Sequence, residues 1–324
     1  MEEIKRIGLL TSGGDAPGMN AAIRAVTRAA IHRNIEVFGI HRGYQGMIEG
    51  DFTRLQSGDV SGIIQLGGTI LKTARSKDFM QKKGRQQAYE QLKKSEIDAV
   101  IVIGGDGSFT GANIMTKEHE LPFIGIPGTI DNDLYGTDYT IGYDTALNTV
   151  IYAVDKIRDT ASAHNRIFFV EVMGKEAGFL ALMSGIACGA EGILIPEVRN
   201  QFSKLKKYLA QRSRQRKSSI ILVAEGDDEG RAIEVAAKFH QEFPELDIRT
   251  TILGHIQRGG PPSVLDRVNA SRMGVAAVDA LLEDQKCVMI GIVNNNIIHV
   301  PLNKTVKLHK EVSKEFLDLI ELLK

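Results

Sequence analysis

The chain alternates between short apolar runs and helical patterns, and this alternation constrains its fold more than any other feature. The apolar runs lie at Ile4–Leu10, Ile35–Ile40, Ala99–Ile103, Phe123–Ile126, Ile167–Val172, Ile193–Ile195 and Ile220–Ala224. They are apolar on both faces, as strands in the middle of a parallel sheet are. Helical patterns lie at Asn20–Ile31, Thr145–Arg158 and Lys204–Arg212, and Asn20 is the expected N-cap of the first. The alternation predicts an α/β fold with helices on both faces of mainly parallel sheets.

Composition limits the size and location of the protein. With 324 residues, 43% hydrophobic and 25% charged, the chain is typical of a globular protein and long enough for two domains. Basic and acidic residues balance at 40 each, so no overall field favours nucleic acid or an anionic membrane. Cys188 and Cys287 cannot form a disulfide framework, and the N-terminus has only a short apolar run. These features predict a cytoplasmic protein without a signal peptide or membrane span.

Glycine-rich loops follow the expected strands, at the positions where open parallel sheets bind ligands. Thr11–Asp15 leads into a helix, and its paired glycines would let backbone N–H groups approach a phosphate. A tight strand–helix turn needs the same glycines. Gly104–Ser108 places Asp106 inside an anion-binding loop. A carboxylate beside phosphates makes chemical sense mainly with a divalent cation between them, although an Asp–Gly turn is the plain alternative.

Two further loops carry polar groups. Gly125–Asp133 brings Thr129 and two aspartates to a strand end. Paired aspartates often only form turns, but after a phosphate loop they indicate a general base, Asp131, and its orienting neighbour. Leu253–Pro261 offers an imidazole, an amide and a guanidinium within four positions, a set that suits hydroxyls and a phosphate.

Five segments carry a family resemblance. They are Leu10–Asn20 (LTSGGDAPGMN), Ile103–Ser108 (IGGDGS), Pro127–Asp133 (PGTIDND), Val172–Gly174 (VMG) and Leu253–Gly260 (LGHIQRGG). Together they resemble the bacterial ATP-dependent 6-phosphofructokinase family over nearly the whole chain, and the resemblance fades after Val288. It implies two Rossmann-like domains between which the chain crosses more than once. Residues 1–140 would bind ATP, rejoined by about 256–304, and residues 141–255 would bind the sugar phosphate, together with 305–324.

The resemblance implies transfer of the γ-phosphoryl of MgATP to the 6-hydroxyl of fructose 6-phosphate. Asp131 would be the base, with Thr129 nearby, and Asp106 would be the magnesium partner. ATP would be held by Gly14, Arg75, Ser76, Gly105, Asp106, Gly107 and Ser108. Fructose 6-phosphate would be bound by Thr129, Ile130, Asp131, Arg166, Met173, Gly174, Lys175, Glu225, Arg249, His255, Ile256, Gln257 and Arg258.

The resemblance also implies assembly and regulation. Arg166 and Arg249 would reach in from a neighbouring subunit of a homotetramer. An effector, ADP or phosphoenolpyruvate, would bind at Arg24, Arg28, Arg158, Gly189, Ala190, Glu191, Arg216 and Lys217. A solvated basic edge is the plain alternative for Arg24 and Arg28, which share one helix face. The basic run 204–217 has no aromatic platform or RNA-module motif, so nucleic-acid binding is not expected.

The sequence departs from the family pattern at several positions. Lys175 and Phe179 stand where the family usually has arginine and aspartate, and Leu66 replaces another arginine. Lysine keeps the charge but loses the planar fork that grips a phosphate at two points. In the effector set, Ser218 replaces a histidine and Gly62 an acidic residue, so effector binding is expected to be weakened or altered.

Two glycines favour ATP over pyrophosphate as the phosphoryl donor. In pyrophosphate-dependent relatives an aspartate stands at the position of Gly107 and a lysine at that of Gly128. A pyrophosphate-dependent phosphofructokinase remains the alternative. An NAD or lipid kinase would share the Gly-Gly-Asp-Gly loop but lack the segment Leu253–Gly260. A catalytically silent regulatory subunit would usually have lost Asp106 or Asp131, and both are present.

Overall fold

The computed structural model describes residues 4–213 and 218–322, and the chain divides into two compact units. Unit 1 comprises Met1–Thr129, Leu134–Thr145 and Arg258–Lys310, and unit 2 comprises Ile130–Asp133, Ala146–Gln257 and Glu311–Lys324. Each unit is therefore assembled from separate segments of the chain. No helix in the described part of the chain is both long and apolar enough to cross a bilayer.

Unit 1 is built, within the described residues, on a seven-stranded sheet with the order β11-β10-β5-β4-β1-β2-β3. Its strands are β1 (Arg6–Thr11), β2 (Glu36–Ile40), β3 (Phe52–Leu55), β4 (Ala99–Gly104), β5 (Phe123–Pro127), β10 (Val288–Val293) and β11 (Asn296–Pro301). Neighbouring strands from β2 to β10 are parallel, and the edge strands β3 and β11 are antiparallel. Strands β4 and β5 are wholly buried, because their apolar runs are covered by helices on both faces.

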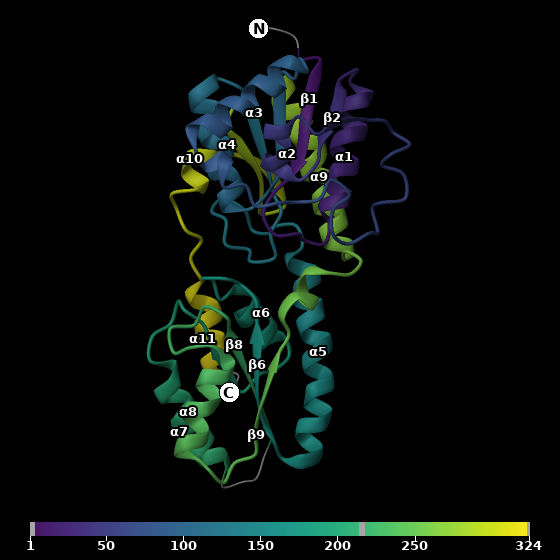
Figure 1. Cartoon of the computed structure of the whole chain (residues 1–324). Helices are drawn as coiled ribbons and strands as arrows, with labels where there is room; N and C mark the ends of the chain where they lie inside the picture. The colour runs from purple at the N-terminus through teal and green to yellow at the C-terminus, as the bar shows by residue number, and fades with distance from the viewer. Residues whose placement is uncertain (1–3, 214–217, 323–324) are drawn as a thin grey trace. The chain divides into compact units, whose positions relative to one another are not determined.

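Helices cover both faces of this sheet. On one face, α1 (Met19–His32) and α9 (Val264–Leu282) pack against each other (Figure 1). On the other face one apolar core joins the sheet to α2 (Gly43–Glu49), α3 (Lys82–Lys94), α4 (Asp106–His119) and α10 (Leu302–Thr305). A 3₁₀ turn, η1 (Asp78–Met80), contributes Phe79 to the same core.

The predicted N-cap at Asn20 is wrong. The N-cap of α1 is Gly18, whose φ of 108° favours glycine. Asn20 is buried inside the helix, and its amide nitrogen donates to the carbonyl oxygens of Leu66 and Gly67 at 3.1 Å each. Its amide oxygen accepts from the backbone N–H of Ile70 at 2.8 Å. The side chain therefore fixes a distant loop rather than the start of its own helix.

Unit 2 holds a parallel sheet of four strands, within the described residues, with the order β7-β8-β6-β9. The strands are β6 (Ile167–Val172), β7 (Gly192–Leu194), β8 (Ser219–Ala224) and β9 (Ile248–Ile252). The helices are α6 (Phe179–Ala187), α7 (Gln201–Ser213), α8 (Ala232–Glu242), α11 (Lys314–Leu322) and most of α5 (Tyr143–His164), and a 3₁₀ segment η2 (Gly254–Arg258) follows β9. The mainly parallel sheet of unit 1 and the parallel sheet of unit 2 confirm the predicted α/β class.

Candidate active site

The carboxyl ends of β1 and β4 lie side by side in the sheet of unit 1. From β1 the chain continues through α1 to β2 on one side, and from β4 it continues through α4 to β5 on the other. Open parallel sheets bind ligands at such a reversal of strand order. The N–H of Ser12 donates to the carbonyl oxygen of Ile103 at 3.0 Å, and that of Gly128 donates to Gly104 at 2.9 Å. Backbone hydrogen bonds thus join the three loops that follow β1, β4 and β5.

The first turn of α4 offers an open anion-binding position. Gly105 is the N-cap, and Asp106, Gly107 and Ser108 form the turn. The N–H of Ser108 donates to the carbonyl oxygen of Gly105 at 3.0 Å, so the donors that a helix start leaves open are those of Asp106 and Gly107. Asp106 and Gly107 are exposed. A Cβ atom added to Gly107 would meet no other atom within 4 Å. The turn therefore presents a carboxylate and backbone donors beside unfilled space.

Thr129 lies against this turn. A Cβ atom on Gly105 would sit 3.6 Å from the Cβ of Thr129, whose carbonyl oxygen accepts from the hydroxyl of Thr140 at 2.6 Å. Asp131 follows two residues later, belongs to unit 2 and is only 8% exposed. The next residue, Asn132, has a φ of 53°, in the left-handed region that few residue types adopt readily. The predicted base is thus a buried carboxylate on a sharply turned backbone.

The segment that carries Arg75 and Ser76 is tied to the same turn of α4. The hydroxyl of Ser76 accepts from the N–H of Phe79 at 3.2 Å. Phe79 stacks on Tyr44, with ring centroids 3.9 Å apart, and the hydroxyl of Tyr44 donates to the carbonyl oxygen of Ser108 at 2.5 Å. Burial raises the pKa of Tyr44, so its hydroxyl keeps the proton that it donates.

Arg85 provides a second tie. Arg85 is 9% exposed, and its guanidinium donates to both carboxylate oxygens of Glu118 at 2.7 and 2.8 Å. The same group donates to the carbonyl oxygens of Phe79 at 3.1 Å and Met80 at 2.8 Å, so it fixes η1 against α4. The Arg85 hydrogen bond holds the pKa of Glu118 below its usual range. Sequence reasoning missed Tyr44, Phe79 and Arg85, because no motif marks them.

Arg258, one of the predicted sugar-phosphate residues, lies in unit 1. Its Nη1 donates to the carbonyl oxygen of Asp15 at 3.1 Å. The guanidinium also occupies the space that a side chain at Gly14 would need, since an added Cβ would lie 2.5 Å from Nη1. The guanidinium of Arg258 therefore lies close against Gly14, which was predicted as an ATP residue.

The carboxyl ends of the strands in unit 2 gather most of the predicted sugar-phosphate residues. The N–H of Met173 donates to Oε1 of Gln257 at 3.2 Å, and the N–H of Lys175 donates to Oε1 of Glu225 at 2.8 Å. These residues follow β6, β8 and β9, and Gly174 lies between Met173 and Lys175. His255 and Ile256, in η2, are exposed, and so is Lys175, which has a φ of 57°.

Arg166 and Arg249 lie on the opposite side of the same sheet, at the ends where its strands begin. Arg166 directly precedes β6, and Arg249 is the second residue of β9, so both stand where the strands begin. Strand β6 has 6 residues. At about 3.3 Å per residue, roughly 20 Å of strand separates the start of β6 from its carboxyl end, which lies beside Lys175 and Glu225. The structure therefore does not bring these two arginines to the other sugar-phosphate residues of their own chain.

The predicted effector residues fall into three groups. Nη2 of Arg158 donates to the carbonyl oxygens of Cys188 at 2.8 Å and Gly189 at 3.1 Å, and its Nη1 lies 3.6 Å from Oε1 of Glu191. Ala190 lies between Gly189 and Glu191 in the chain. Arg24 and Arg28 belong to α1 in unit 1 and are half-buried, whereas Arg216 and Lys217 lie outside the described residues.

The positions that depart from the family pattern differ in their surroundings. Phe179 is buried as the first residue of α6, and Leu66 is 46% exposed. Gly62 has a φ of 70°, and an added Cβ there would meet nothing within 4 Å. Ser218 is half-buried and precedes β8. Position 179, where the family usually has aspartate, is thus occupied by a buried apolar side chain at the start of α6.

Asp106 is the residue best placed to hold a divalent cation. In residues 4–213 and 218–322, no three His, Cys, Asp or Glu side chains gather so that they could hold a metal ion by themselves. Mg²⁺ bound together with a nucleotide needs only one or two carboxylates, since phosphate oxygens and water complete its octahedron. The exposed carboxylate of Asp106, beside the open first turn of α4, fits that requirement.

Known proteins match the chain over most of its length. A family model described as Phosphofructokinase matches residues 6–281. A curated relative from Bacteroides thetaiotaomicron, named ATP-dependent 6-phosphofructokinase 2, is 57% identical over 325 residues, which cover 100% of this chain and 99% of that protein. The ATP-dependent 6-phosphofructokinase of Cytophaga hutchinsonii is 51% identical over 99% of this chain and 98% of its own. The crystal structure of Pichia pastoris phosphofructokinase in the T-state matches 94% of this chain with a TM-score of 0.87 and 43% identity, and the chain spans 36% of its length.

Proposed function

The chain belongs to the phosphofructokinase family, and on this premise we propose that it is an ATP-dependent 6-phosphofructokinase. It would transfer the γ-phosphoryl of ATP to the 6-hydroxyl of fructose 6-phosphate, giving fructose 1,6-bisphosphate and ADP as a step of glycolysis. The observation that carries this proposal is the open first turn of α4, with Asp106 beside it, at the reversal of strand order in unit 1.

Unit 1 is the proposed ATP-binding domain. Gly14, Arg75, Ser76 and the segment Gly105–Ser108 would hold the nucleotide, its phosphates facing the N-terminus of α4. Mg²⁺, held by Asp106, would supply charge that offsets the phosphate oxygens. The ties through Tyr44 and Arg85 keep the Arg75–Ser76 segment and the α4 turn in one arrangement before the nucleotide binds, which lowers the ordering cost of binding.

Two glycines support ATP as the donor. A side chain at Gly107 would project into the open space beside the α4 turn, where an aspartate would repel nucleotide phosphates. A side chain at Gly128 would meet Cγ2 of Ile103 at 2.9 Å and Cε of Met19 at 3.2 Å, so a lysine would require these neighbours to move. Packing thus disfavours a lysine at position 128, whereas at position 107 only a bound nucleotide would disfavour an aspartate.

Unit 2 is the proposed sugar-phosphate domain. Met173, Gly174, Lys175, Glu225, His255, Ile256 and Gln257 would bind fructose 6-phosphate at the carboxyl ends of β6, β8 and β9. Asp131 would accept the proton of the 6-hydroxyl as that oxygen attacks the γ-phosphorus, with Ile130 and Thr129 contacting the sugar. Arg258 would contribute from the loop beside Gly14. General-base help of this kind is typically worth about 10²–10⁴ in rate.

A neighbouring subunit would complete the sugar-phosphate site. Arg166 and Arg249 stand about 20 Å of strand away from Lys175 and Glu225 in their own chain. The two arginines would therefore bind the phosphate in another chain of a homotetramer. ADP or phosphoenolpyruvate would bind at the Arg158–Glu191 cluster and the other predicted effector residues. We place this enzyme in the cytoplasm, where glycolysis runs.

A donor assay tests the proposed function. The purified protein is given fructose 6-phosphate and Mg²⁺ with either ATP or pyrophosphate, and fructose 1,6-bisphosphate is measured. We expect product with ATP and none with pyrophosphate. Product with pyrophosphate alone would favour the pyrophosphate-dependent alternative, and no product with either donor would favour the silent regulatory subunit.

A further inference from the structure

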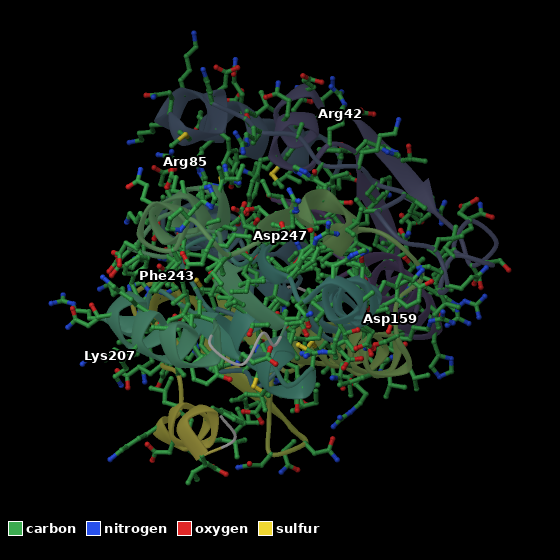
Figure 2. The ribbon with its side chains drawn as sticks, turned by 90° about the horizontal axis from the view of Figure 1, so that it is seen from below. Arg42, Arg85, Asp159, Lys207, Phe243 and Asp247 are labelled. Carbon is green, nitrogen blue, oxygen red and sulfur yellow. The ribbon has the colours of Figure 1, made fainter. Side chains whose placement is uncertain are left out.

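A carboxylate lies between the two arginines at the strand-start edge of unit 2. Oδ2 of Asp247 accepts from Nε of Arg166 at 2.7 Å, and its Oδ1 lies 2.9 Å from Nε of Arg249. Figure 2 labels Asp247 and shows the side of unit 2 on which its strands begin. The hydrogen bond from Arg166 and the charges of both arginines hold the pKa of Asp247 below its usual range, so the carboxylate stays ionised at neutral pH.

The backbone around these three side chains is fixed by the sheet. The N–H of Ile167 donates to the carbonyl oxygen of Asp247 at 3.1 Å, which joins the turn before β9 to the start of β6. Phe168 pairs with Arg249 across the two strands. The N–H of Arg166 donates to the carbonyl oxygen of Ala161 at 3.0 Å, at the end of α5. The carboxylate and both guanidinium groups therefore start from backbone positions that sheet and turn hydrogen bonds hold together.

Both contacts use the Nε atoms and leave the outer Nη edges of the guanidinium groups available. Across the part of the chain that the structure describes, Arg166 and Arg249 have no other side-chain hydrogen bond. Their side chains are 27% and 54% exposed, so an anion from solvent can reach them. Two guanidinium groups with free outer edges match a phosphate monoester, which offers three oxygens.

We propose that Asp247 is a positioning residue, which holds Arg166 and Arg249 as a preformed clamp for the phosphate group of the sugar substrate. The proposal rests on the proposed function, because it requires these arginines to bind that phosphate. A carboxylate also reduces the net positive charge of the clamp, which works against anion binding. At this exposed edge, salt and water screen the charge effect, whereas the entropy lost on ordering two long side chains is not screened. The gain in phosphate binding from ordering the two arginines should therefore exceed the loss from the negative charge of Asp247.

Replacement of Asp247 tests the clamp in the full-length protein. Asp247→Asn keeps the shape but only one acceptor oxygen, and Asp247→Ala removes both. We expect Asp247→Asn to raise the KM for fructose 6-phosphate by about 3- to 10-fold, because a partly exposed charge-assisted hydrogen bond contributes about this much to binding. Asp247→Ala should raise this KM further. The KM for ATP, kcat and the melting temperature should stay unchanged. A KM for fructose 6-phosphate that stays the same or falls would overturn the proposal.

Matched variants separate positioning from other causes. Glu245→Gln removes one negative charge from an exposed position in the same turn and should leave the KM for fructose 6-phosphate unchanged. An equal rise in this control would show that net charge, and not the clamp, is responsible. Arg249→Ala tests the underlying function. If it leaves that KM unchanged, the sugar-phosphate role of the arginines fails; if it raises the KM while Asp247→Asn does not, only the clamp is wrong.

Discussion

Gly107 stands at the second position of α4, and the space beyond its α-carbon is empty of protein atoms. The fold itself would accept a side chain there, because the backbone is helical and an added Cβ meets nothing within 4 Å. In the proposed function, a larger residue would be excluded by the nucleotide and not by the fold. Donor specificity would then depend on a residue whose added side chain would meet no protein atom within 4 Å.

Gly107→Asp should lower kcat/KM for ATP by at least about tenfold, since placing like charges together costs several kcal/mol. The melting temperature should not change. Steady-state kinetics with varied MgATP measure the effect, and Gly107→Ala, which adds bulk without charge, is the matched control. Unchanged kinetics for ATP in the aspartate variant would contradict the role given to this position.

Asp131→Asn should lower kcat by roughly 10²–10⁴ while both substrates still bind. Asparagine has nearly the same shape, but its amide cannot accept the proton of the 6-hydroxyl. Stopped assays give kcat, and calorimetry with fructose 6-phosphate checks that binding survives. A variant that keeps more than about a tenth of the wild-type turnover would show that another group is the base.

At the scale of elements, the Arg75–Met80 segment and helix α4 act as one structural piece. The stacked pair Tyr44 and Phe79 lies between them, and the Tyr44 hydroxyl reaches the carbonyl oxygen of Ser108. Arg85, labelled in Figure 2, joins η1 to Glu118 further along the helix. A nucleotide that binds the α4 turn therefore meets the segment carrying Arg75 and Ser76 already in place.

Tyr44→Phe should lower the free energy of unfolding by about 0.5–1.5 kcal/mol, the usual net value of a hydrogen bond. It should also raise the KM for ATP and leave the KM for fructose 6-phosphate unchanged, because the loosened contact lies in unit 1. Chemical denaturation and steady-state kinetics measure the two effects. Tyr89→Phe is the control, since Tyr89 also stacks on a ring, that of His119, but lies away from the α4 turn. Equal effects of the two substitutions would refute the positioning role of Tyr44.

Local patterns predict some elements of this molecule well and others poorly. The buried strands were predicted because they are apolar on both faces, and the match to a solved phosphofructokinase confirms the phosphofructokinase-like fold. The short edge strand β3 and the half-exposed β9 were not predicted, since their polar residues resemble those of loops. Strand β10 is apolar and buried, but it was also missed.

The site shows a similar division between short motifs and distant contacts. Glycine-rich loops such as Gly104–Ser108 are contiguous in the sequence and can be recognised there. Tyr44 and Ser108 are 64 positions apart, and Arg166 and Asp247 are 81 apart. No local pattern links such pairs, so Tyr44 and Asp247 became visible only in the folded chain. Asn20 is the converse case, because a typical capping residue serves a loop about 50 positions away.

At the scale of the whole molecule, the two ends of β6 serve different sites in the proposed function. Lys175 follows one end, and Arg166 precedes the other. A single chain should therefore carry an incomplete sugar-phosphate site. Two variants that are each nearly inactive, Asp131→Asn and Arg249→Ala, should complement each other in mixed oligomers.

We expect mixed assembly of these two variants to restore partial turnover at a wild-type KM for fructose 6-phosphate. Sites that combine an intact Asp131 from one chain with an intact Arg249 from another would account for it. Differently tagged chains, refolded together and purified through both tags, provide the sample, and each variant refolded alone is the control. Verified mixed oligomers without recovered activity would rule out a site shared between subunits.

Neither unit of this protein corresponds to one uninterrupted stretch of its gene. On the ribosome, all of β6 to β9 is translated before α9, β10 and β11, so the sheet of unit 2 can close while that of unit 1 still lacks two strands. Until α9 has been synthesised, the buried side of α1 has no helix to cover it. For the same reason, its gene cannot be cut at one point into two independently folding halves, and recombination between relatives must exchange matching pieces on both sides of the middle segment.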